Sequence, residues 1–154
     1  ENLMGLGVRL GTPAPRENGP TTWLAEFARI AKERDVRFDF VAVHWYDWGS
    51  NPATSPGASA EVIFNRFKTY LAQVYAEYQL PIWVTEFNAN PNRPYSTHAA
   101  FLELALPYLE SLPYVERYAY FQEAEQILVD EAPILPIYNY TTNAGAVSAN
   151  PFSC

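Results

Sequence analysis

The sequence predicts an α/β fold built from parallel β/α units. Four short apolar runs alternate with three longer segments of helical periodicity. This alternation implies right-handed parallel connections, which either close into a (β/α)8 barrel or remain an open doubly wound sheet. The long loops all follow predicted strands, so we expect functional groups at the carboxyl ends of those strands. No glycine-rich phosphate fingerprint follows any of them, which argues against nucleotide binding.

The first unit is predicted over residues 8–35. Residues 8–14 have the pattern of a strand that ends at Pro13 and Pro15. Thr21 and Thr22 are candidate caps for a helix that runs to about Asp35. Its apolar residues recur at three- and four-residue spacing and predict one buried face, formed by Trp23, Leu24, Phe27, Ile30 and Ala31.

Two further units and a last strand complete the pattern. Residues 38–46, FDFVAVHWY, carry apolar side chains on both faces, as expected for a strand covered on both sides. Ser59 precedes a helix that ends near Leu80. The next strand spans 82–87, and Thr97 is expected to cap a helix that reaches about Leu112. The last strand is predicted over 115–121.

The prediction divides the chain into two parts. Residues 1–122 form the β/α domain, and residues 123–154 form a C-terminal part with a short helix over 123–131 and an irregular, extended tail. With 154 residues, of which 49% are hydrophobic, the chain has enough apolar material for a substantial core.

Composition excludes several classes of function. A net charge of -7 repels nucleic acid, and the ten Lys and Arg residues are scattered rather than clustered. No apolar run is long enough to cross a bilayer, and the N-terminus lacks the pattern of a signal peptide. Cys154 is the single cysteine, so no cysteine cluster can hold a metal. Because the chain begins at Glu1, we expect a processed product, a fragment or an engineered piece.

Three side chains are candidates for chemistry at the carboxyl ends of strands. Alternation within PIWVTEF places Ile82, Val84 and Glu86 on one face. The residue pattern alone leaves open whether Glu86 is a catalytic acid or a structural carboxylate paired with a cation. His44 and Tyr46 share a face of the preceding strand, and the convergence of His, Tyr and Glu on one rim favours a functional site.

The four segments VRLGTPAP, FDFVAVHWYDW, PIWVTEFNA and LPYLESLPYVERYAYFQ resemble glycoside hydrolase family 128, a glycosyl hydrolase catalytic-core family of β-1,3-glucanases. The similarity covers about residues 7–122. In that family these segments are strands five to eight of a TIM-type (β/α)8 barrel. The resemblance therefore implies the second half of such a barrel.

The resemblance also implies roles for individual residues. Glu86 corresponds to the catalytic nucleophile of a retaining enzyme. His44 and Tyr46 correspond to residues that line the sugar cleft, and Tyr120 corresponds to an aromatic residue that faces the sugar. Trp48, in a loop, is a further candidate for stacking on sugar, whereas Trp45 is expected to pack against helices. The implied substrate is a β-glucan polysaccharide or oligosaccharide, no metal or organic cofactor is needed, and the implied location is extracellular.

One part of the mechanism is missing from this sequence. Retaining hydrolysis needs a second, protonated carboxylate about 5 Å from the nucleophile. Family members carry it in an Asn-Glu-Pro motif, which does not occur here. Asp47 is the nearest carboxylate in the sequence, but alternation places it on the face opposite His44. Either another chain supplies the missing half of the barrel or two copies pair, and an N-terminal half-barrel partner would also supply the acid/base residue. A homodimer would restore eight strands without restoring that residue.

Two alternatives remain open. The chain is a non-catalytic glucan-binding or scaffold half-barrel if the acid/base group is truly lost. Residues 123–143, EAEQILVDEAPILPIYNYTTN, weakly resemble the C-terminal part of bacterial extracellular oligopeptide-binding proteins. That second resemblance would instead suggest a peptide binder associated with a transporter.

Overall fold

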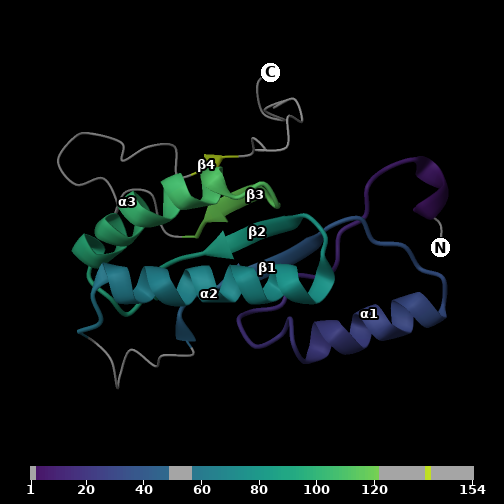
Figure 1. The fold of residues 1–154 in the computed structure, drawn as a ribbon, viewed down its shortest axis with the longest axis horizontal. Coiled ribbons are helices and arrows are strands. Elements are labelled where there is room, and N and C mark those ends of the chain that lie inside the picture. The colour runs from purple at the N-terminus through teal and green to yellow at the C-terminus, as the bar shows by residue number, and fades with distance from the viewer. Residues whose placement is uncertain (1–2, 49–56, 122–137, 140–154) are drawn as a thin grey trace.

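The computed structural model describes residues 3–48, 57–121 and 138–139, and it confirms the predicted α/β class (Figure 1). One sheet has the strand order β1-β2-β3-β4. The first three strands are parallel, whereas β4 pairs antiparallel with β3. Within the described residues the sheet stays open and does not close into a barrel. The strands are β1 (Val41–Trp45), β2 (Ile82–Phe87), β3 (Val115–Tyr120) and β4 (Tyr138–Asn139).

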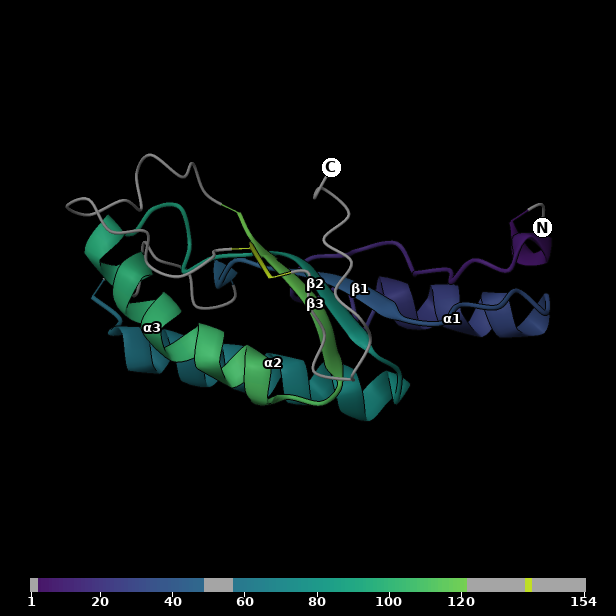
Figure 2. The ribbon, with the colours of Figure 1, turned by 90° about the horizontal axis from the view of Figure 1, so that it is seen from above.

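Two long helices cover one face of this sheet. Figure 2 shows α2 and α3 side by side beneath the strands, while α1 lies apart from that pair. We call the face under α2 and α3 the helix-covered face, and the opposite side of β1, β2 and β3 the open face. The helices are α1 (Trp23–Glu33), α2 (Ala60–Tyr78) and α3 (Tyr95–Ser111), preceded by a short 3-10 helix, η1 (Met4–Leu6).

Local sequence explains where α2 begins and ends. The Ser59 hydroxyl accepts a hydrogen bond from the Val62 backbone N–H, as an N-cap does. The helix ends at Tyr78; the C-cap residue, Gln79, adopts the left-handed conformation with φ 52°, and Pro81 follows shortly after. α3 begins two residues before the expected cap, at Tyr95, because Pro94 occupies the N-cap position. Thr97 is therefore already inside the helix.

The predicted first strand over residues 8–14 is wrong in its extent. Only Gly11 forms a bridge, parallel to Phe40, and the Thr12 N–H donates to the Phe40 carbonyl. Pro13 and Pro15 have no N–H to donate, so the ladder cannot continue. The Thr12 hydroxyl replaces part of it by accepting from the Ala42 N–H at 3.0 Å.

Aromatic packing dominates the helix-covered face. Phe87 of β2 stacks on Phe67 of α2 with ring centroids 5.3 Å apart, and Phe101 of α3 packs edge-on against both. All three side chains have no exposed surface. Trp45 lies in the same cluster, 4.8 Å from Phe67, so the expectation that it packs against helices is confirmed.

The open face uses a different kind of contact. Phe40 stacks on Trp83 with centroids 3.9 Å apart, and Arg9 and Arg117 lie over Phe40 and Trp83, respectively. The Glu116 carboxylate accepts hydrogen bonds from Arg9 Nη1 at 2.8 Å, from Arg9 Nη2 at 3.1 Å and from the Trp83 indole N–H at 2.9 Å. This side of the sheet is held by rings and charges together.

The C-terminal prediction lies almost wholly outside the described residues. The expected short helix over 123–131 falls there, as does most of the tail. The two-residue strand β4 is the part of the 123–154 region that the structure describes. The boundary at residue 122 stays a prediction.

Candidate active site

The parallel pairing of β1 and β2 brings the candidate residues together. His44 and Glu86 are register partners on adjacent strands, and both lie at the carboxyl ends of those strands. Tyr46 directly follows β1. His44, Tyr46 and Glu86 are in contact at this rim, and their functional role stays a prediction.

Glu86 reaches this rim by a route that alternation does not predict. Val84 and Phe87 are both fully buried on the helix-covered face, although two residues separate them. The register with β3 shifts between Val84 and Phe87, and the register with β1 shifts at the facing position. This irregularity, a β-bulge, turns Glu86 away from the face of Ile82 and Val84. The expectation that these three share a face is therefore wrong.

One oxygen of the Glu86 carboxylate binds two partners. The Tyr46 hydroxyl donates to Oε2 in a short hydrogen bond, and His44 Nδ1 lies 3.3 Å from the same atom. Among the described residues none bonds the other oxygen, Oε1. The Glu86 side chain is 33% exposed. The arrangement orients the carboxylate while the side chain stays partly exposed.

The electrostatic environment keeps Tyr46 protonated. Burial is the largest cause that raises the pKa of Tyr46, followed by its hydrogen bond to Glu86 and by the negative charges of Glu86 and Glu17. A protonated phenol donates its hydrogen bond to Glu86 across the neutral pH range.

Tyr120 does not lie at this rim, which corrects the expectation that it faces a sugar. Its side chain is 3% exposed and packs edge-on against Phe87 in the helix-covered face. The next residue, Phe121, is 57% exposed and packs edge-on against Tyr46. Because successive residues of a strand point to opposite faces, a one-residue difference exchanges the two sides. Phe121 is the aromatic residue beside the candidate site.

Tyr120 instead takes part in a buried polar contact that the sequence analysis missed. Its hydroxyl hydrogen-bonds His98 Nδ1, and His98 Nε2 lies 3.0 Å from the Asn90 carbonyl oxygen. A carbonyl only accepts, so Nε2 carries the proton and Nδ1 accepts from Tyr120. Burial is the main cause that lowers the pKa of His98. The pair ties α3 to the loop after β2.

Trp48 lies on the surface next to the site. Its side chain is 43% exposed, and it lines a hollow of about 310 Å³ together with Arg16, Glu17 and Asn18. The expectation that Trp48 stacks on sugar stays a prediction. Arg16 and Asn18, which flank Glu17 in the wall of this hollow, are both exposed.

Asp47 points away from Glu86, as alternation predicts. Its carboxylate is buried and accepts from Arg93 at 2.7 Å and from Arg66 at 3.2 Å. These contacts engage the buried carboxylate, so Asp47 is not placed to supply a proton to a leaving group. Its role here is structural.

Glu17 is a second residue that the sequence analysis missed. One of its oxygens, Oε1, accepts from the backbone N–H of Tyr46 at 2.6 Å and from that of Trp48 at 3.0 Å. A Glu in a Gly- and Pro-containing loop carries no local signal for such a contact, because the partners lie about thirty positions away. The loop position after the first predicted strand was the available hint.

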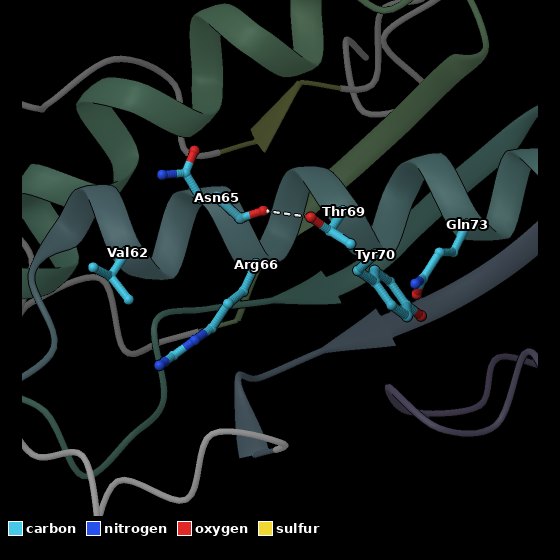
Figure 3. Close-up of a pocket in the computed structure, with 6 residues that line it drawn as sticks. All are labelled: Val62, Asn65, Arg66, Thr69, Tyr70 and Gln73. Carbon is cyan, nitrogen blue, oxygen red and sulfur yellow. Dashed lines mark hydrogen bonds between the residues drawn. The ribbon is translucent and has the colours of Figure 1, made fainter.

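A larger hollow than the one beside Trp48 lies elsewhere. Figure 3 shows it along α2, where Val62, Arg66, Tyr70 and Gln73 project from one helix; the Tyr70 hydroxyl donates to the His44 carbonyl of β1. Its volume is about 450 Å³, and Thr69 donates to the Asn65 carbonyl within it, which is an ordinary helix contact. None of the three rim residues lines it. Size alone therefore does not identify the site.

Other kinds of site find no support in the described part of the chain. Within residues 3–48, 57–121 and 138–139, no three His, Cys, Asp or Glu side chains gather in a way that suits a metal ion. Over the same ranges, no helix combines the length and apolar character that crossing a membrane requires.

Comparison with known proteins gives a consistent result. Residues 2–143 match the family described as "Glycosyl hydrolase catalytic core". This range includes residues 123–143, the segment with the second resemblance. A curated relative, alkali-sensitive linkage protein 1 of Schizosaccharomyces pombe, is 31% identical over 123 residues, which are 77% of this chain and 20% of that protein.

Solved structures agree with the family match. The glycoside hydrolase family 128 (subgroup I) endo-β-1,3-glucanase of Amycolatopsis mediterranei, in complex with laminarihexaose, has a TM-score of 0.63 and 32% identity, covering 91% of this chain and 56% of that one. A curdlan-specific exo-β-1,3-glucanase (subgroup III) from Blastomyces gilchristii has a TM-score of 0.59 and 28% identity, covering 78% and 48%, respectively. This chain thus spans about half the length of these enzymes.

Proposed function

The chain belongs to the glycosyl hydrolase catalytic-core family, as a member of glycoside hydrolase family 128, and we propose that it carries the nucleophile side of a retaining β-1,3-glucanase site. Glu86 is the nucleophile in this proposal. The observation that supports it most is the state of the carboxylate: Oε2 is bound by Tyr46 and His44, and no described residue bonds Oε1.

The proposed chemistry follows from that arrangement. Oε1 attacks the anomeric carbon and forms a covalent glycosyl-enzyme intermediate, which water then hydrolyses. The Tyr46 hydroxyl and His44 hold Oε2, so the carboxylate keeps one orientation through both steps. The leaving oxygen takes a proton from a second carboxylate. Asp47 and Glu17 are both engaged as hydrogen-bond acceptors, so this group comes from outside the described residues.

The proposed substrate is a β-1,3-glucan. The Amycolatopsis enzyme is described in complex with laminarihexaose and with laminaritriose, which are β-1,3-linked oligosaccharides. In this chain Trp48 and Phe121 are the exposed aromatic residues nearest the rim in sequence, each within two residues of Tyr46 or the end of β3. We assign sugar contacts to Trp48, Phe121, His44 and Tyr46. Action on a polysaccharide supports an extracellular location as part of this proposal.

The proposed partner is the complementary half of a (β/α)8 barrel. Among the described residues the sheet does not close on itself: the short 10–15 segment lies beside β1, and the open face presents Trp83 and Arg117 rather than a layer of helices. Four strands from an N-terminal half would close it and bring the acid/base carboxylate. A homodimer closes the sheet as well but supplies no such residue.

The proposal is tested by measuring the hydrolysis of soluble β-1,3-glucan by this chain together with the complementary N-terminal half of the barrel. Glu86→Gln removes the nucleophile with little change of volume, and we expect kcat to fall by ~10³-fold or more. Glu103→Gln is the matched control, since Glu103 is an exposed glutamate on α3. Its activity is expected to equal that of the parent protein.

Two results would overturn the assignment in different ways. Activity that survives Glu86→Gln removes Glu86 from the nucleophile role. A parent protein that binds laminarihexaose by calorimetry but never cleaves it, even with both halves present, supports the non-catalytic glucan-binding alternative. Binding of the 154-residue chain alone, without cleavage, agrees with the proposal.

A further inference from the structure

The turn formed by residues 46–48 holds Tyr46 next to Glu86 and exposes Trp48. Its central residue, Asp47, has φ 56°, a left-handed conformation that a non-glycine residue rarely adopts. Such a backbone costs about 1 kcal/mol or more and persists only where the surroundings hold it. The contacts that hold this turn therefore determine where the Tyr46 hydroxyl lies.

Two sets of contacts hold the turn. In the first, the Asp47 carboxylate accepts from Arg93, which also donates to the Ala89 carbonyl at 2.6 Å in the loop after β2. In the second, Glu17 Oε1 accepts from the backbone N–H groups of both Tyr46 and Trp48. Backbone N–H groups that converge on one anion in this way form a nest. Here the anion is a side chain of the protein itself.

The Glu17 carboxylate is itself anchored to β1. The Pro15 carbonyl, two residues before it, accepts from the His44 N–H at 2.9 Å. Segment 15–17 thus runs along the end of β1 and contacts His44, Tyr46 and Trp48 in turn. The same oxygen, Oε1, accepts from both N–H groups, so the Glu17 carboxylate is fixed against the turn.

We infer that Glu17 is a positioning residue of the proposed active site, because its carboxylate fixes the turn that directs the Tyr46 hydroxyl at Glu86. Tyr46 is held at both ends, with its N–H on Glu17 and its hydroxyl on Glu86. The Glu17 carboxylate therefore orients Tyr46, and Tyr46 in turn orients the Glu86 carboxylate. The catalytic meaning of this inference rests on the proposed function of Glu86. The contacts among Glu17, Tyr46 and Glu86 do not depend on that function.

Titration of the Tyr46 phenol by NMR, with ¹³C-labelled tyrosine in the 154-residue chain, tests this positioning. Tyr46→Phe identifies the signal. Glu17→Gln keeps an acceptor oxygen for the two N–H groups and removes only the charge, whereas Glu17→Ala removes the acceptor too. We expect the pKa of Tyr46 to be lower in Glu17→Ala than in Glu17→Gln by about one unit or more, because the phenol leaves Glu86.

Equal Tyr46 titrations in the alanine and glutamine variants overturn the inference, since charge alone would then explain any change. If Glu17→Ala does not fold, Glu17→Asp takes its place. It keeps the charge but is one methylene shorter, so it is expected to show the same loss of the Tyr46 contact relative to Glu17→Gln. An unchanged Tyr46 in that variant is equally decisive against the inference.

Kinetics in the protein with both barrel halves separates this inference from the proposed function. Glu17→Ala is expected to lower kcat by ~100-fold, with recovery in Glu17→Gln, as a displaced reacting group does. A Tyr46 signal that depends on Glu17, in a protein whose hydrolysis survives Glu86→Gln, supports the positioning and rejects the proposed function. Conversely, if Glu86→Gln abolishes hydrolysis but the Tyr46 signal does not depend on Glu17, the proposed function is supported and the positioning role of Glu17 is rejected.

Discussion

The two faces of the sheet are stabilised in different ways. On the helix-covered face, Phe87 packs among the rings of Phe67 and Phe101 with no exposed surface. On the open face, Trp83 stacks on Phe40, and its indole N–H donates to Glu116. Burial of apolar area is the larger contribution of the two, because contacts between charges and rings at partly exposed sites are each worth little.

This difference explains where the candidate site lies. The helix-covered face provides the stability, so the open face is free to carry polar groups with accessible atoms. Glu86 lies at the end of β2, one residue from Phe87 in the core. A rigid core residue next to the carboxylate fixes its backbone, while its side chain remains 33% exposed on the other side.

The largest effect is expected from truncating the helix-covered face. Phe87→Ala removes a fully buried ring and leaves a cavity, so we expect a loss of ~3–5 kcal/mol in the free energy of unfolding. Phe121→Ala is the matched control on the open face, because that ring is 57% exposed. Urea unfolding followed by circular dichroism measures both. Similar losses in the two variants would contradict the contrast between the faces.

A smaller, pH-dependent effect is expected from His98 on the helix-covered face. Its pKa is lowered from 6.5 by burial, so the unfolded chain binds a proton at a higher pH than the folded protein does. The stability that neutral His98 contributes is therefore present above pH 6.5 and is lost as the pH falls below it. At pH 8, His98→Gln is expected to cost ~1–3 kcal/mol through the lost hydrogen bonds.

Unfolding free energies at several pH values between 8 and 5 check the His98 prediction. The parent protein and His98→Gln should converge as the pH falls. A constant difference between them across this range would show that His98 is not held in its neutral form.

The smallest effect is expected on the open face. Burial tends to raise the pKa of Glu116, but the hydrogen bonds from Arg9 and Trp83 outweigh it and hold the pKa below 4.5. The contribution of Glu116 to stability is thus present above pH 4.5 and is lost as the pH falls through the lower folded pKa. Glu116→Gln is expected to cost about 1 kcal/mol at pH 7, because Arg9 is about half exposed.

Chemical unfolding of Glu116→Gln at pH 7 and pH 3 measures this contribution, with Glu103→Gln as the exposed control. The difference from the parent protein should shrink at pH 3. A loss at pH 7 as large as that of Phe87→Ala would mean that the open face is as important for stability as the core.

The sequence predicted much of this fold because its periodicities are strong. Apolar alternation located β1 and β2, and helical spacing located α1 and α2 to within a few residues. The strand over residues 8–14 failed because the prolines that end it also remove its hydrogen-bond donors. The helix start at Tyr95 was missed because Pro94, rather than Thr97, occupies the cap.

The candidate site was less predictable, for two physical reasons. Alternation placed His44 and Tyr46 on one side of β1, but the bulge that turns Glu86 has no signature in PIWVTEF. Glu17 and His98 were missed because their partners are far away in the sequence. Tyr120 was placed on the wrong side because its face depends on the register with β2, which only the pairing of the strands determines.

The bulge in β2 accommodates one residue more than simple alternation between Val84 and Phe87 allows. If the strand lost this irregularity and kept Thr85, either Glu86 would turn beneath the helices or Phe87 would leave its stack on Phe67. Removing Thr85 would instead leave Val84 and Phe87 on one face and Glu86 on the other, in unbroken alternation. The position of the carboxylate and the packing of the core thus both depend on where one extra residue is placed in the strand.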